Sequence, residues 1–127
     1  MEEHSILEDI RKLLGSTIDD GFELDIILHI NDCFERLHDL GVGPNEIFQI
    51  EDATATWGDF FGDKPVLPRV KTYMAKYVKR AFDPPTGSVL ESLERQIKES
   101  EWLLNASVDP TPSDKEYMNL QPLWGEE

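Results

Sequence analysis

Apolar residues recur at intervals of three and four in four stretches of the chain, at residues 5–15, 24–40, 68–82 and 86–105. This spacing places them on one face of an α-helix, where they can be buried against other helices. The chain has 127 residues, enough for one compact domain with a single core. The pattern predicts a mainly α fold, with a four-helix bundle-like domain.

Residues that start or stop helices stand at the ends of these stretches. Ser5 is followed three residues later by Glu8, a capping-box pattern, and Gly15 closes the first stretch. Pro68 suits the first turn of a helix, whereas Asp83 precedes a proline and is driven out of the helical conformation. The remaining signals are Gly41-Val42-Gly43-Pro44 after the second helix and Thr86 or Ser88 as the cap of the fourth.

The segment 45–66, between the second and third predicted helices, is compatible with two structures. Residues 47–50 are typical of a strand, and residues 56–61 fit either a turn of helix or a second strand. We predict a long loop or a small β-hairpin. Its aromatic residues either fold over the helices or contact a neighbouring subunit, and the candidates for such contacts are Trp57, Phe60 and Phe61.

The chain is strongly acidic, with 26 Asp and Glu residues against 12 Lys and Arg and a formal net charge of -14. This charge repels phosphate backbones, so we expect no specific binding to nucleic acid. An acidic wall that does not hold DNA would still suit a conduit through which DNA passes.

Other features of the sequence favour a soluble protein made in the cytoplasm. Cys33 is the single cysteine, so no intrachain disulfide can form. The N-terminal residues lack the positive charge and the unbroken apolar run of a signal peptide. No segment approaches the roughly 18 uninterrupted apolar residues of a membrane span, so we expect no membrane association.

No sequence motif indicates catalysis or a cofactor. Gly41 and Gly43 follow a helix and lack the Lys-Ser or Lys-Thr of a phosphate-binding loop. His29 and Cys33 lie one helical turn apart, but two ligands without further convergent ones are a weak signal for a metal. Paired acids such as Asp19-Asp20 are more simply explained as caps or solvated carboxylates. We therefore expect no enzyme activity, no cofactor and no metal.

The composition changes after the fourth predicted helix. We divide the chain into a helical domain at residues 1–105 and an extended C-terminal arm at residues 106–127, which contains prolines and acids. A purely solvated tail rarely carries large apolar residues, so we interpret the arm as a peptide that orders against a partner. Its candidate contacts are Tyr117, Leu120, Leu123 and Trp124.

Two features of the third and fourth helices suggest further contacts. The third helix gathers cations, among them Arg69, Lys76 and Arg80, which fit an ion-paired surface between subunits better than a nucleic-acid site in so acidic a chain. Advancing 100° per residue from Leu93 places Trp102 opposite the apolar face of its helix. Trp102 either lies over a loop of its own subunit or anchors a neighbouring one.

The order of several short blocks along the chain resembles the phage head-tail connector proteins, also called adaptor or head-completion proteins. The resemblance covers nearly the whole chain to Asn105. The first three blocks are Ile6-Leu7-x-x-Ile10-Arg11-Lys12-Leu13-Leu14-Gly15, Asp25-Ile26-Ile27-x-His29-Ile30-Asn31 and Leu40-Gly41-Val42-Gly43-Pro44. The later blocks are Trp57-Gly58-Asp59-Phe60, Val70-Lys71-Thr72-Tyr73, Phe82-Asp83-Pro84-Pro85 and Glu101-Trp102-Leu103-Leu104-Asn105.

The resemblance implies a helical subunit of the phage neck that assembles as a ring, typically of twelve copies, beneath the portal protein. Such a ring extends the channel for genomic DNA and presents a surface to the next neck, stopper or tail-terminator protein. The protein would be made in the host cytoplasm and become part of the virion. Two rival hypotheses are a non-viral acidic helical module that grips one protein partner and a small enzyme that uses the paired acids.

Overall fold

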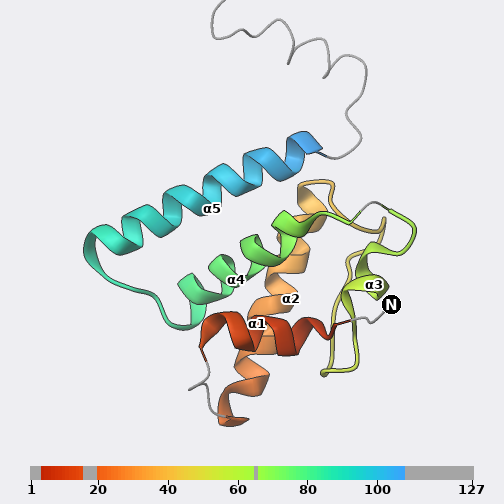
Figure 1. Cartoon of the computed structure of the whole chain (residues 1–127), viewed down its shortest axis with the longest axis horizontal. Coiled ribbons are helices and arrows are strands. Elements are labelled where there is room, and N and C mark those ends of the chain that lie inside the picture. The colour runs from red at the N-terminus through yellow and green to blue at the C-terminus, as the bar shows by residue number, and fades with distance from the viewer. Residues whose placement is uncertain (1–3, 16–19, 65, 108–127) are drawn as a thin grey trace, which may run out of the picture.

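Helices make up most of the described part of the protein, which comprises residues 4–15, 20–64 and 66–107 of a computed structural model (Figure 1). In chain order they are α1 (Ile6–Leu14), the short 3-10 helix η1 (Asp20–Phe22), α2 (Glu23–Asp39), α3 (Trp57–Phe61), α4 (Pro68–Phe82) and α5 (Gly87–Ser107). α4 packs against α1, α2 and α5, with α5 along one of its sides and α1 along another (Figure 1). The prediction of a mainly α, bundle-like fold is confirmed.

The ends of the helices follow from local chemistry. The Ser5 hydroxyl accepts a hydrogen bond from the Glu8 N–H at 3.2 Å, which caps α1. α4 begins with Pro68 in its first turn and ends at Phe82, immediately before Asp83 and the two prolines. α5 begins at Gly87, directly after Thr86, and extends to Ser107. The predicted helix bounds therefore agree with the structure to within about two residues, the usual uncertainty at helix ends.

The possible β-hairpin at residues 45–66 does not form. The described residues contain no strand, only one antiparallel bridge between Ser5 and Thr56. The reason lies in α2, where the Asn31 side chain accepts from the Ile50 N–H at 2.7 Å and donates to the Ile50 carbonyl at 3.0 Å. Since these are the backbone groups that a partner strand would need, the segment runs along α2 as an irregular loop.

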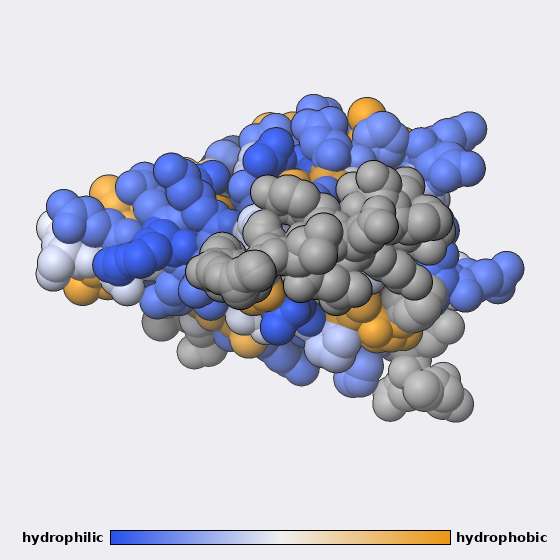
Figure 2. Space-filling model, turned by 90° about the horizontal axis from the view of Figure 1, so that it is seen from above, coloured by the Kyte–Doolittle hydropathy of each residue, from blue (hydrophilic) through white to orange (hydrophobic). Residues whose placement is uncertain are grey.

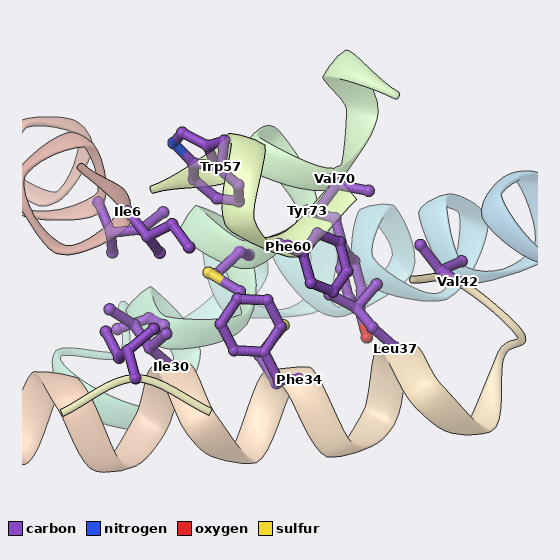
Figure 3. Packing of buried hydrophobic residues seen from close by; sticks show 14 of the residues in the cluster. Ile6, Ile30, Phe34, Leu37, Val42, Trp57, Phe60, Val70 and Tyr73 are labelled. Carbon is purple, nitrogen blue, oxygen red and sulfur yellow. The ribbon is translucent and has the colours of Figure 1, made fainter. Parts of the chain in front are cut away.

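The aromatic residues of this loop complete the core. Thr56 and Asp59 form a reciprocal capping box that starts α3. The Phe60 ring then lies 4.9 Å from the Phe34 ring of α2 (Figure 3). Both rings also pack against Phe48, at 5.4 and 5.0 Å between ring centres. At Gly43 the backbone has φ +97°, and a Cβ there would lie 2.5 Å from the Phe60 ring, so only glycine fits.

A polar cluster ties α2, α4 and α5 together at the edge of the core. The Glu101 carboxylate on α5 accepts two hydrogen bonds from the Arg36 guanidinium, at 3.0 and 3.2 Å, and one from the Tyr73 hydroxyl at 2.7 Å. Partial burial on its own raises the pKa of Glu101, but the hydrogen bonds and the charge of Arg36 outweigh it, so the pKa is lowered. The charged carboxylate is therefore the form that stabilises the fold.

We expect replacement of Glu101 by glutamine to cost roughly 1–2 kcal/mol of unfolding free energy at pH 7, because one charge-assisted pair is lost. Because the pKa of Glu101 is lower in the folded state, its ionisation stabilises the fold at pH values above the pKa of the unfolded state. This stabilisation is lost as the pH falls through the pKa of the folded state. Urea unfolding of the unsubstituted protein and of Glu101→Gln should thus show that the difference in unfolding free energy becomes smaller at acidic pH. A difference that stays constant with pH would contradict this role.

Candidate functional site

The most prominent exposed aromatic side chain of the described residues is Trp102 on α5. Its side chain is 64% exposed, whereas Ile97 and Leu104 on the same helix are buried. The adjacent Glu101 faces inward to Arg36 and Tyr73, so the helix turns Trp102 away from the bundle. Of the two interpretations of this residue, the described part of the subunit gives no support to a covering loop. The role of Trp102 as an anchor for a neighbouring molecule stays a prediction.

Acidic side chains form a stripe along the outer face of α2, which we define as Asp25, Asp32, Glu35 and Asp39. All four are exposed, and their spacing of seven, three and four residues keeps them on one side of the helix. Asp32 accepts a hydrogen bond from the Tyr77 hydroxyl at 3.3 Å, and burial, together with this carboxylate, raises the pKa of Tyr77 to about 12. The sequence carried this signal, but the prediction treated the acidity only as a property of the whole chain.

The three predicted basic contacts, Arg69, Lys76 and Arg80, do not form one patch. Lys76 lines a hollow with Leu14 on the α1 side of α5, whereas Arg80 lies with Glu94 of α5 in a different hollow. Arg80 also stacks on the Tyr77 ring, 5.2 Å from its centre. Arg69 is exposed at the start of α4. The three cations are therefore separate candidate contacts.

The candidacy of Trp57, Phe60 and Phe61 as contacts to a neighbouring subunit is not supported, since all three are buried in the core of their own subunit. The Trp57 indole donates a hydrogen bond to Asp9 on α1 at 2.9 Å, and Lys71 pairs with the same carboxylate at 3.1 Å. Burial alone raises the pKa of Asp9, but these two partners outweigh it and lower the pKa. Trp57 thus holds the loop onto α1.

Two apolar residues that the periodicity assigned to the core are instead exposed. Leu13 of α1 is 56% exposed and Val89 of α5 is 61% exposed. Both continue the buried stripes of their helices, Leu13 after Ile10 and Val89 before Leu93. Both line open hollows beside α4, Leu13 with Ala75 and Val89 with Lys79, so an apolar surface remains there.

The predicted contacts in the arm, Tyr117, Leu120, Leu123 and Trp124, lie outside the described residues. Helix α5 runs two residues past the predicted domain boundary at Asn105, and the Asn105 side-chain amide donates to the Leu40 carbonyl at 2.9 Å. The end of α5 is therefore fixed to the end of α2.

The part of the chain that the structure describes holds neither a cluster of metal ligands nor a membrane-spanning helix. In residues 4–15, 20–64 and 66–107 no group of three or more His, Cys, Asp or Glu is arranged to hold a metal ion. Cys33 is buried, which raises the pKa of its thiol, and His29 packs its ring against Phe82. Among the helices of this part of the chain, none has the length and apolar character needed to cross a membrane.

Comparison with models of protein families finds a match. The model of a family described as phage connector protein matches residues 6–111, which includes every helix of the described fold. Comparison with curated proteins finds no match, and comparison with solved structures finds none either.

Proposed function

The chain belongs to the phage connector protein family, and from this premise we propose that it is a ring-forming structural subunit of the phage neck. In this proposal, copies of the chain close a ring, with twelve as the expected number, between the portal protein and the next neck, stopper or tail-terminator protein. The subunit catalyses nothing and becomes part of the virion after assembly in the host cytoplasm. The family match over residues 6–111 is the observation that carries the proposal.

The acidic stripe of α2 supports the proposal that this helix forms part of a channel wall facing DNA. A channel that must let DNA slide needs a surface that does not bind phosphates, and four exposed carboxylates on one helix face repel them. Further exposed acids follow between α2 and α4, at Glu46, Glu51, Asp52 and Asp63 in the loop and at Asp59 in α3. We therefore propose that α2 and this loop face the lumen, and that genomic DNA passes without specific binding.

Trp102 supports a contact between neighbouring molecules. A closed ring uses heterologous interfaces, so each subunit needs two different surfaces that fit each other. Viewed from the α5 side, the described surface is mainly hydrophilic with separated hydrophobic spots (Figure 2). The exposed Trp102 offers a large aromatic side chain of the kind that anchors interfaces. The exposed cations, Arg69 first among them, are candidates for the charged rim of such an interface.

Mixing the purified chain with the cognate portal protein tests the proposal. We expect one discrete complex in native mass spectrometry, with a fixed number of chains for each portal ring. A chain that ignores the portal and binds one unrelated protein would instead favour the acidic interaction module.

A further inference from the structure

Two adjoining hollows form one open groove across the face of α4 between α1 and α5. Their volumes are about 640 and 330 Å³, within the range of roughly 300–1,000 Å³ typical of ligand-binding clefts. Both are lined by Lys79 and Leu93, which join them into one surface that we call the α1/α5 groove. Leu13 lies at one end of the groove and Val89 at the other.

At the groove, the apolar stripes of α1 and α5 extend beyond the residues that are buried in the core. Ile6 and Ile10 of α1 are buried, and Leu13 continues their face into the groove, where it is exposed. In α5 the buried Ile97 is followed toward the start of the helix by Leu93 and then by the exposed Val89, at intervals of four residues. Apolar stripes that run past the described bundle indicate that another segment covers them.

We propose that the C-terminal arm of the same chain, residues 114–124, docks in the α1/α5 groove. The arm follows Ser107, which lies fourteen residues after Leu93 on α5, a distance of about 21 Å along the helix. Residues 108–113 contain two prolines, and six residues at about 3.1 Å each span roughly 19 Å when extended. Gln96, which also lines the groove, lies eleven residues before Ser107, about 17 Å along the helix. The linker can therefore reach the near end of the groove at Gln96, and the arm segment itself continues from there toward Leu93 and Val89.

The chemistry of the arm complements that of the groove. The arm segment supplies apolar side chains for the leucines and Val89, namely Tyr117, Met118, Leu120, Leu123 and Trp124. Residues 108–127 also hold five acidic side chains against one lysine, while Lys76 and Lys79 are the charged residues that line the groove. Because the arm is tethered, its effective concentration at its own groove is of millimolar order, which favours its own chain over a second copy in dilute solution.

Cross-linking within the full chain tests this docking. Ser88→Cys places a thiol on the groove, and Met118→Cys places one on the arm. The control pairs Met118→Cys with Glu46→Cys, on the exposed loop close to the end of α5, where Asn105 is bonded to Leu40. An undocked arm would reach this nearer site more readily. The native Cys33 is buried, which limits its reaction with a short bis-maleimide.

We expect single-chain cross-links for the groove pair to exceed those of the control pair by roughly tenfold. Leu13→Glu should abolish that excess, since it removes apolar contact and adds charge that repels the arm. Leu28→Glu, at a similarly exposed leucine on α2, should leave it unchanged, and circular dichroism checks that both variants remain helical. Equal yields for the two pairs, covalent dimers in place of single-chain products, or insensitivity to Leu13→Glu would overturn the proposal. No portal is present, so this result is independent of the ring proposal.

Discussion

Replacement of Phe34 by alanine should remove roughly 3–5 kcal/mol of unfolding free energy, a large part of the roughly 5–15 kcal/mol that holds a domain together. Phe34 is 1% exposed and touches the Phe48 and Phe60 rings, at 5.0 and 4.9 Å between ring centres. Its removal leaves a cavity where α2, the loop and α3 meet (Figure 3). Urea unfolding followed by circular dichroism measures the loss.

Leu28→Ala is the matched control, because Leu28 lies on the same helix and is 65% exposed. It should change the unfolding free energy by no more than about 0.5 kcal/mol. If both substitutions had equal small effects, the aromatic cluster would not be the centre of the core.

Replacement of Trp102 by alanine should weaken assembly by roughly 30-fold while the subunit stays folded. The side chain is largely exposed, so its loss costs the isolated subunit little. An anchoring tryptophan at an interface is typically worth at least about 2 kcal/mol of binding free energy, which corresponds to that factor. The dependence of ring formation on protein concentration, measured by analytical ultracentrifugation, gives the change.

Leu24→Ala offers a comparison at another exposed apolar position, on α2. It should leave the assembly midpoint near that of the unsubstituted protein. The opposite result would be reduced helicity of the isolated Trp102→Ala subunit with an unchanged assembly midpoint for the folded fraction. It would show that the tryptophan serves folding and not assembly.

The four long helices could be predicted from the sequence because their signals are local. The Ser5 cap, Pro68 and the prolines after Asp83 each act within a few residues of the helix end that they define. The sequence left a loop and a hairpin open for residues 45–66 because the contact that decides for the loop is distant in sequence, from Asn31 to Ile50. The capping box of Thr56 and Asp59 was a local signal for α3 that the prediction did not use.

The candidate contacts were harder to predict, since periodicity gives the face of a helix but not the length over which a neighbour covers it. Leu13 and Val89 lie on the expected faces yet are exposed, because they border open hollows beside α4 instead of a filled core. Likewise, Lys76 and Arg80 are four residues apart on α4, but α5 separates the hollows that they line. The position of Trp102 was predictable because it depends only on its rotation about the axis of α5.

Imaging the neck of mature particles of the cognate phage by electron microscopy is the most direct test of the central claim. The connector hypothesis predicts a closed ring of this chain directly beneath the portal, with the α2 acids lining the DNA channel. A neck that lacks the chain, in particles that are otherwise complete, would contradict it.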